Sequence, residues 1–474
     1  MGIRDWRIDA EQEPVLRVGV VLAGDGIATL EMRVPEEGYL LGGGQTVTGR
    51  SVRGAVLRAR LVDDAIALSV DGGPLQTAPM WSIAPERSRP PARGDGVLVR
   101  GVVAGRGFHW QKRVDQTLTG RIELRADRGG LVLVNELPLE PYLAGVITAE
   151  MSGACPAEFL RAQCIVARSW LLAFTERKHD AEPFDRCNDD CCQRYQGTGD
   201  LSDAALDAVD STRGLVLVAP DGRVVDANYS KSCGGVSELP EHVWGVHKPG
   251  VGAVVDAPAG SAARRFLPVT EETLDDYLDG DWLARTDVYC SPNVVPEEEF
   301  GRYLGRVDEA GHYFRWTITY ARKQLEELLR RKLPQAFSLA RLCDLRVTKR
   351  GVSGRATEIA IAFDTAAGER REIRVADQYR IRQILHEKFL FSSAFAVRIE
   401  RANALPDTPP VPDAAKRSQS PGHPDITTVT LRGAGWGHGV GLCQIGALGM
   451  ALRGIDSERI VRHYFPDAAL RRVY

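Results

Sequence analysis

The chain has 474 residues, of which 44% are hydrophobic and 26% are charged, and its formal net charge is −3. These proportions are typical of a globular protein of about two to four domains. The near-neutral charge gives no electrostatic reason to expect nucleic acid or an anionic membrane as a partner. No run of residues approaches the roughly 18 apolar positions of a membrane-spanning helix, so we expect no transmembrane segment.

The first part of the chain is rich in expected β-strands. Residues 15–135 alternate runs such as VLRVGVVLAG and GVLVRGVVAG with glycine-rich turns, which is the pattern of strands joined by tight turns. Residues 1–20 do not show the charged-then-apolar pattern of an export signal. We therefore expect a β-rich N-terminal domain over residues 1–129.

Two helices are expected next, and a carboxylate lies at the end of the first. Leu143, Val146 and Ile147 recur at helical spacing, and the next position of this apolar stripe is Glu150. The second helix is expected to begin with Pro156 and to run to about Lys178. A helix C-terminus and apolar neighbours both disfavour a charged carboxylate, and a protonated carboxylic acid can protonate a leaving oxygen. The alternative is a helix-end glutamate that pairs with a nearby arginine.

Four segments, in order along the chain, resemble the SpoIID/LytB family (stage II sporulation protein D and its amidase-enhancer relatives). The first segment is LPLEPYLAGVITAEMSGACPAEFLRAQCIVARSW, similar to the family pattern LPLExYLxGVVxxEMxxxxPxEALKAQAVAARTY. The second and third are FDRCNDDCCQRYQG and NYSKSCGGVSELPEHVWG. The fourth is GAGWGHGVGLCQIGALGMALRG, similar to GxGxGHGVGMSQxGAxxMA. The resemblance covers roughly residues 130–474.

The resemblance implies an α+β fold in which a SpoIID/LytB-like mixed α/β domain, residues 130–474, carries a glycan groove. Residues 250–312 are acidic and lack a clear period, which predicts an insertion. The segment RWTITYARKQLEELLRRKL is expected to begin as a strand and to continue as an amphipathic helix. Residues 402–424 are rich in proline and polar residues, which predicts an exposed loop.

The resemblance also implies an activity. Sporulation members of the family are peptidoglycan lytic transglycosylases, which cleave the β-1,4 bond between N-acetylmuramic acid (MurNAc) and N-acetylglucosamine (GlcNAc) in denuded glycan strands. The product ends in 1,6-anhydro-MurNAc, because the C6 hydroxyl of the sugar is the nucleophile, and the family's catalytic glutamate falls on Glu150. One acid/base then suffices, whereas a glycoside hydrolase usually needs two carboxylates. The sequence gives no reason to pair Asp189, Asp190 or Glu238 with Glu150.

A non-enzymatic function is the alternative. The protein would then be an amidase enhancer, a glycan-binding module that stimulates an N-acetylmuramoyl-L-alanine amidase without cutting glycan. The partners implied are glycan strands and, for the alternative, a cell-wall amidase; nucleic acid is not expected. The resemblance implies a location at the cell wall, outside the membrane.

Polar and aromatic side chains in the four segments are candidates for sugar binding. They are Gln163, Arg168, Tyr229, Ser230, Ser232, Trp436, His438 and Gln444. For Gln163 and Arg168 the alternative is a buried network that braces the two helices, and for His438 it is a hydrogen-bonded structural histidine. Cys443 stands where the family has serine. We expect these segments to converge on one open groove with Glu150 at its centre.

A group of cysteines and one histidine suggests a metal site. His179, Cys187, Cys191 and Cys192 offer four ligands of the types that zinc prefers in a tetrahedral site. Some family members have His, Cys, His and Cys at these places, so the resemblance favours a structural zinc ion. The alternatives are a disulfide or free thiols, since the adjacent Cys191 and Cys192 make an awkward chelate. No organic cofactor is expected.

Overall fold

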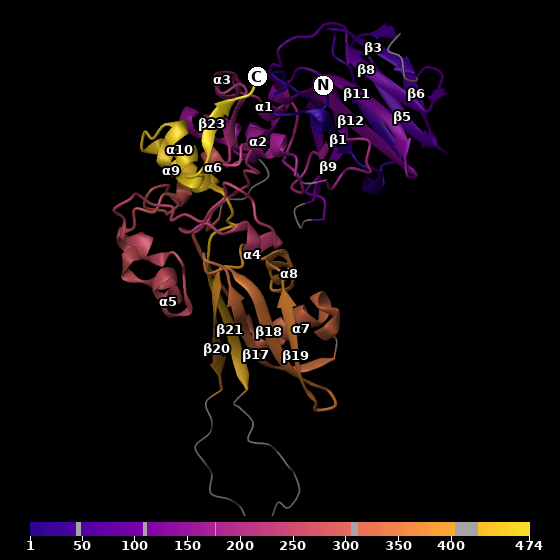
Figure 1. Cartoon of the computed structure of the whole chain (residues 1–474). Helices are drawn as coiled ribbons and strands as arrows, with labels where there is room; N and C mark the ends of the chain where they lie inside the picture. The colour runs from indigo at the N-terminus through magenta and orange to yellow at the C-terminus, as the bar shows by residue number, and fades with distance from the viewer. Residues whose placement is uncertain (44–48, 108–110, 176, 305–310, 337, 403–424) are drawn as a thin grey trace, which may run out of the picture.

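The computed structural model describes residues 1–43, 49–107, 111–175, 177–304, 311–336, 338–402 and 425–474. Helices and several separate β-sheets make up an α+β fold, as the sequence predicted. Figure 1 shows a β-rich N-terminal region, a group of helices beside it, and a lobe that extends away from both. No helix among the described residues has the length and apolar character needed to cross a membrane.

The N-terminal region consists of two β-sheets that share one apolar core. The seven-stranded sheet has the order β13-β1-β12-β11-β8-β3-β4, with β13 Arg186–Cys187, β1 Val15–Val21, β12 Gly130–Pro138, β11 Arg121–Asp127, β8 Met80–Pro85, β3 Tyr39–Gly43 and β4 Arg50–Val52. The six-stranded sheet has the order β10-β9-β2-β5-β6-β7, with β10 Lys112–Leu118, β9 Val97–Ala104, β2 Thr29–Arg33, β5 Val56–Val62, β6 Ala65–Val70 and β7 Gln76–Ala78. Two 3-10 helices, η1 Ile3–Asp5 and η2 Ala23–Asp25, flank β1.

Strand β12 connects this region to the helices. It pairs with both β1 and β11, and α1 (Leu139–Glu150) begins at the residue after it. Helix α2 (Ala157–Ala173) follows α1, and their apolar side chains belong to the same core as the two sheets. Helix α2 ends five residues before the expected position, because Phe174 takes a left-handed backbone conformation with φ of 44°.

The C-terminal elements pack on these helices. Helices α9 (Gln444–Leu452) and α10 (Ser457–Tyr464) both contact α2, and β23 (Ala469–Arg472) pairs with β14 (Leu215–Val218). Helix α3 (Asp203–Ser211) contacts α1 and α2. The two chain termini therefore lie near the same group of helices (Figure 1).

The distal lobe, residues 315–402 and 425–434, has an apolar core of its own. One three-stranded sheet has the order β16-β21-β20 (Arg315–Ala321, Ile426–Ala434, Phe395–Arg401), and the other has the order β17-β18-β19 (Leu339–Arg350, Ala356–Thr365, Arg370–Ala376). Helices α7 (Arg322–Lys332) and α8 (Gln378–Ile384) and the 3-10 helix η6 (Pro334–Ala336) complete it. The direct step from β16 to α7 confirms the strand-then-helix expectation.

The segments that join the distal lobe to the helices and the N-terminal region are mostly irregular. Within residues 250–312 the regular elements are short: η3 Ala262–Phe266, α5 Glu271–Asp279, η4 Asp281–Arg285, η5 Glu297–Glu299 and α6 Phe300–Tyr303. The short elements β15 (Tyr229–Ser230), α4 (Pro240–Trp244) and β22 (Leu442–Cys443) complete the junction. The expected exposed loop over 402–424 falls almost entirely outside the described residues.

Candidate functional site

Glu150 is the last residue of α1, as predicted, and only 9% of its surface is exposed. Its Oε1 accepts two hydrogen bonds, one from the hydroxyl of Tyr229 at 3.1 Å and one from the backbone N–H of Arg194 at 3.1 Å. The two donors come from the third and second family-like segments. Because two donors fix one oxygen, the carboxyl group is held in one orientation at the helix end.

Lys231 holds the backbone of the same residue. Its Nζ donates to the carbonyl oxygen of Glu150 at 2.9 Å and lies 3.3 Å from Sδ of Met151. That carbonyl is one of the last four of α1, which have no partner inside the helix, so the ammonium group is a favourable C-terminal partner. Lys231 was not among the residues predicted from the sequence. Its spacing of two residues from Tyr229 in an extended segment was the available signal, since such residues point to the same side.

Asp190 is a second acid near Glu150, although the sequence provided no reason to pair the two residues. Arg194 connects the two residues, because its backbone binds Glu150 while its guanidinium forms an ion pair with Asp190. Burial raises the pKa of Asp190 to about 6, the ion pair with Arg194 opposes this rise, and the negative charges of Glu150 and Asp189 add to it. The side chain of Asp190 is therefore engaged by Arg194 and lies within electrostatic reach of Glu150.

The glycine-rich C-terminal segment joins the segment that carries Tyr229. Strand β15 runs parallel to β22, and Ser232 exchanges backbone hydrogen bonds with Trp436 at 3.1 and 2.8 Å. Gly439 has φ of +78°, and a Cβ there would lie 2.3 Å from the guanidinium carbon of Arg355, so a side chain is excluded. The predicted convergence of Glu150, the Tyr229 segment and the GWGHGVG segment is thus present.

Trp436 and His438 lie at the partly exposed end of this arrangement. The indole ring of Trp436 stacks on Phe391, with ring centroids 4.6 Å apart. The Nδ1 atom of His438 accepts a hydrogen bond from the N–H of Val440 at 3.0 Å. Burial, together with nearby arginine and lysine side chains, lowers the pKa of His438 to about 3, so this ring is neutral at pH 7. The geometry fits the structural role that the sequence left open for His438.

Two of the predicted sugar ligands cannot contact a sugar directly. Gln163 and Arg168 are fully buried on α2. The guanidinium of Arg168 binds both oxygens of Glu140 on α1, at 3.0 and 2.7 Å. Neither side-chain polar atom of Gln163 has a hydrogen-bond partner among the described residues. We therefore correct the substrate-binding assignment of these two residues: Arg168 braces α1 against α2, which was the alternative.

The other predicted sugar ligands differ in their exposure. Tyr229 is half-buried, whereas Ser230 is 8% exposed and its Oγ has no hydrogen-bond partner among the described residues. Ser232 is fully buried, and its Oγ accepts a hydrogen bond from the N–H of Gly234 at 3.3 Å. Gln444 begins α9 and is 1% exposed. Tyr229, Trp436 and His438 are therefore the partly exposed members of the predicted set, whereas Ser232 and Gln444, like Gln163 and Arg168, are closed off from solvent.

The predicted metal ligands do come together. One donor atom from each of His179, Cys187, Cys191 and Cys192 lies within 4.8 Å of the others, and we call this group the cysteine-histidine cluster. The Sγ atom of Cys191 lies 3.7 Å from Nε2 of His179 and 3.9 Å from Sγ of Cys192. All four thiol and imidazole groups are zinc ligands of the ordinary kind, and the cysteines are not joined by disulfides. The donor set therefore fits a zinc ion, whereas the 3.0 Å between Sγ of Cys187 and Sγ of Cys191 is shorter than the spacing of two sulfurs on one zinc ion.

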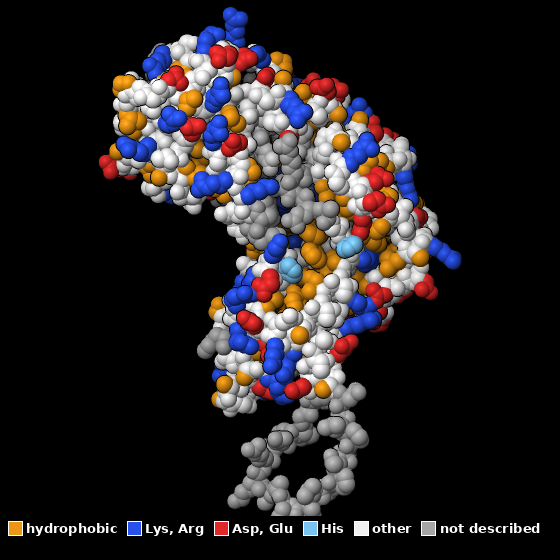
Figure 2. Space-filling model, turned by 180° about the vertical axis from the view of Figure 1, so that it is seen from behind, with side chains coloured by type: hydrophobic (Ala, Val, Ile, Leu, Met, Phe, Trp, Pro, Cys, Tyr) orange, Lys and Arg blue, Asp and Glu red, His pale blue; other side chains and the backbone are white. Residues whose placement is uncertain are grey.

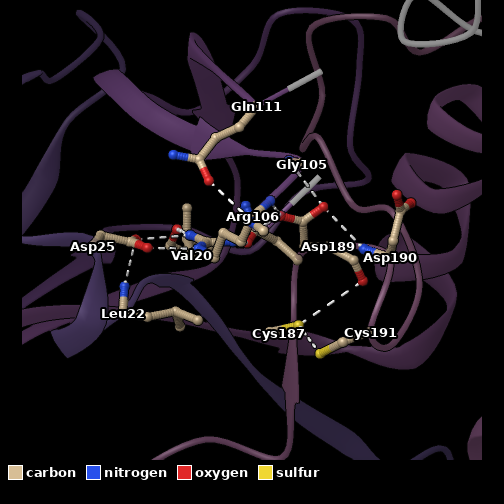
Figure 3. A network of polar contacts seen from close by, with 12 residues as sticks. Val20, Leu22, Asp25, Gly105, Arg106, Gln111, Cys187, Asp189, Asp190 and Cys191 are labelled. Carbon is tan, nitrogen blue, oxygen red and sulfur yellow. Dashed lines mark hydrogen bonds and ion pairs between the residues drawn. The ribbon is translucent and has the colours of Figure 1, made fainter. Parts of the chain in front are cut away.

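A charged network attaches this cluster to the N-terminal region (Figure 3). The guanidinium of Arg106, after β9, binds both carboxylate oxygens of Asp25 at 2.6 and 2.8 Å. The carboxylate of Asp189 accepts the backbone N–H groups of Gly105 at 3.0 Å and Arg106 at 2.7 Å. Asp189 lies between Cys187 and Cys191, so the network fixes the loop that leads to Arg194. The backbone N–H of Arg194 in turn binds Glu150.

Figure 2 shows a hollow on the surface between the N-terminal region and the distal lobe. Hydrophobic and histidine side chains line it. A cavity of about 910 Å³ is lined by residues that include Trp6, Phe174, Thr175, Trp244 and Lys248. Glu150 is not among the lining residues. The open groove centred on Glu150 therefore stays a prediction, although the segments expected to form it are in contact.

Comparisons with known proteins match two separate parts of the chain to two different families. Residues 127–218 match the SpoIID family, described as stage II sporulation protein, and residues 274–441 match a domain of unknown function, DUF8618. An uncharacterized protein of Brachyspira hyodysenteriae is 36% identical over 124 residues, which are 26% of this chain. The match covers 33% of that relative. The SpoIID match confirms the family resemblance for the region that contains α1, Glu150, α2 and the cysteine-histidine cluster, and it supports a sporulation-related role at the cell wall.

Proposed function

We propose that the protein is a peptidoglycan lytic transglycosylase in which Glu150 is the single acid/base. The observation that carries the proposal is the carboxyl group at the end of α1, within the SpoIID-like region, held by the Tyr229 hydroxyl and the Arg194 N–H. The substrate is the glycan strand of peptidoglycan after removal of its stem peptides, and the bond cleaved is the β-1,4 bond between MurNAc and GlcNAc.

The reaction needs two proton transfers, one from Glu150 to the leaving oxygen and one from the C6 hydroxyl back to Glu150. Glu150 in its acid form protonates the glycosidic oxygen, and the GlcNAc leaving group departs with that proton. The C6 hydroxyl of the same MurNAc then attacks C1, and the Glu150 carboxylate takes the hydroxyl proton. The product is a 1,6-anhydro ring, and the acid is restored without a water molecule. Asp190 acts in this scheme as a positioning residue, because its carboxylate is engaged by Arg194.

A non-catalytic amidase enhancer is the second candidate. The segments SKSCGG and GLCQ differ from the family's hydroxyl-rich pattern, and Ser232 and Gln444 within them are buried. An enhancer would raise the rate of a cell-wall N-acetylmuramoyl-L-alanine amidase without shortening glycan strands. Two assays distinguish these functions. A transglycosylase releases soluble glycan fragments from denuded strands on its own. An enhancer releases none, but it raises the rate at which an added amidase acts on intact peptidoglycan.

Removal of the Tyr229 hydroxyl should slow the reaction moderately. In Tyr229→Phe the carboxyl of Glu150 loses one of two hydrogen bonds that orient it. A neutral hydrogen bond contributes about 0.5–1.5 kcal/mol, so we expect kcat to fall about 2- to 13-fold with little change in KM. The measurement is the initial rate of fragment release. The control is Tyr320→Phe, whose hydroxyl binds the carbonyl of Leu385 in the distal lobe and should not affect the rate; an unchanged rate in Tyr229→Phe would contradict the assigned contact.

We further propose that the cysteine-histidine cluster binds one zinc ion with a structural role. A zinc ion held by four protein ligands has no open position for catalysis, and here it would hold the loop that leads to Arg194. Thiolate and imidazole ligands must be deprotonated, so acid should release the metal. Elemental analysis of protein purified under reducing conditions should show that Cys191→Ser contains one zinc fewer per chain than the wild type. Equal zinc content in the two proteins would rule the site out.

A further inference from the structure

A second cluster of metal-ligand side chains lies in the interior of the molecule. Cys233, Asp256, Cys290 and Cys443 each offer one donor atom, and these atoms all lie within 4.8 Å of one another. We call this group the inner cysteine cluster. Each of the four residues is at most 1% exposed. Neither the sequence patterns nor the family resemblance pointed to this group.

The four residues come from separate parts of the chain. Cys233 follows β15, Asp256 and Cys290 belong to the segment 250–312, and Cys443 is the residue before α9. Buried cysteines often serve as small hydrophobic residues. That explanation does not account for a buried aspartate placed among three thiols, because an aspartate disrupts an apolar core unless its charge is compensated.

Among the described residues, Asp256 has no strong cationic partner. Within the described residues its one ion-pair contact is with Nε2 of His463, at 3.9 Å, which is too long for a hydrogen bond. Its oxygens accept the hydroxyl of Tyr464 at 2.6 Å and the N–H of Cys290 at 3.1 Å. A carboxylate has about four lone-pair sites, so these two bonds leave capacity for a metal ion. Hydrogen bonds of this kind also orient carboxylates that ligate metals.

The sulfur atoms are placed for thiolate ligands. Sγ of Cys443 accepts the N–H of Cys233 at 3.2 Å and the N–H of Gly446 at 3.3 Å. Sγ of Cys233 accepts the N–H of Gly235 at 3.4 Å. Donors directed at a sulfur favour its negative charge, and the start of α9 adds the positive end of a helix dipole at Cys443. Three cysteines and an aspartate with their donor atoms in one place are ligand types of a single metal ion, and binding of the ion would deprotonate them.

One sulfur–sulfur distance matches the geometry of a single tetrahedral ion. With Zn–S bonds of about 2.3 Å, two sulfurs on one tetrahedral zinc ion lie about 3.8 Å apart. The Sγ atoms of Cys233 and Cys290 are 3.8 Å apart, whereas a disulfide would require about 2.05 Å. Soft thiolates with one carboxylate suit Zn²⁺, and oxygen-seeking ions such as Mg²⁺ or Ca²⁺ would not choose three sulfurs. We infer that the inner cysteine cluster binds a second zinc ion, in a closed structural site.

This ion would hold in place the segment 229–233, which carries Tyr229 and Lys231, the two residues that bind Glu150. Cys443 is the register partner of Ser230 in the β15–β22 pair, and Cys233 lies two residues after Lys231, which holds the carbonyl of Glu150. Through Asp256 and Cys290 the same ion would attach the segment 250–312. A structural purpose for that segment follows, and it does not depend on whether the protein cleaves glycan.

The zinc content of matched variants tests the inference. Protein purified under reducing conditions without chelators should contain two zinc ions per chain by elemental analysis and native mass spectrometry. Cys443→Ser and Asp256→Asn should each contain one fewer. Cys343→Ser, which removes a buried thiol outside both clusters, should keep two. Cys443→His retains a ligand at this position and should also keep the second ion, which separates metal loss from unfolding.

Three results would overturn the site. One is a wild-type protein without the second zinc ion, and another is a zinc content that Cys443→Ser and Asp256→Asn both leave unchanged. The third is a disulfide between Cys233 and Cys290 in the protein as purified under these reducing conditions, detected as a mass two hydrogens lower. A protein with two zinc ions that does not cleave glycan would contradict the proposed function alone.

Discussion

In Glu150→Gln the formation of anhydro products from denuded glycan strands should fall by about two to four orders of magnitude, which is the usual effect of removing a general acid. The amide has nearly the same shape as the acid, and its oxygen can still accept the hydrogen bonds of Tyr229 and Arg194. It can neither donate the proton that the leaving oxygen needs nor take the proton of the C6 hydroxyl. Chromatography of the fragments with mass spectrometry measures the rate.

Binding and folding provide the controls for this variant. Thermal unfolding and the affinity for denuded strands should stay close to the wild type, because the carboxyl contributes to the reaction step rather than to the core. Glu182→Gln changes another glutamate of the SpoIID-like region, in an ion pair with Arg128, and should keep the full rate. A Glu150→Gln protein that turns over at nearly the wild-type rate would show that Glu150 is not the acid.

Arg168→Ala should destabilise the protein by about 3–5 kcal/mol, because it leaves the buried carboxylate of Glu140 without its cationic partner. Neither side chain of this ion pair is exposed by more than 3%. The remaining hydrogen bonds to Glu140, from the Tyr474 hydroxyl at 2.7 Å and the Gly214 N–H at 3.2 Å, cannot neutralise the charge. Urea unfolding, with the free energy extrapolated to water, measures the loss.

Arg161→Ala is the matched control on the same helix. Arg161 pairs with Glu158 in a partly exposed position, and such pairs contribute about 0–1 kcal/mol. If Arg168→Ala kept wild-type stability but bound glycan more weakly, Arg168 would be a sugar ligand after all, and its bracing role would be wrong.

Local patterns in the sequence predicted the features that depend on neighbouring residues. The apolar stripe that ends at Glu150 is a matter of helical spacing, and the structure places Glu150 at the end of α1. The four ligands of the cysteine-histidine cluster lie within 14 residues of one another, so a single loop brings them together. The end of α2 was placed too late, because a left-handed residue is usually glycine and Phe174 gives no such signal.

Long-range contacts could not be predicted in this way. Cys233 and Cys443 are separated by 210 residues, and only the folded chain shows that they meet at Asp256. The place of Asp190 beside Glu150 depends on how Arg194 turns between them. Arginine is usually found at the surface or in a ligand-binding site. Arg168 is buried because it forms an ion pair with Glu140 on another helix. Periodicity shows which face of an element is apolar but not which remote polar group it meets.

The catalytic proposal is tested most directly by the chemical ends of the fragments that the wild-type protein makes from denuded strands in water labelled with heavy oxygen. We expect ends of 1,6-anhydro-MurNAc that contain no heavy oxygen, because the C6 hydroxyl of the sugar attacks in place of water. Reducing ends that carry one heavy oxygen would contradict it. They would indicate hydrolysis with a second carboxylate, for which Asp190 is the neighbour in place.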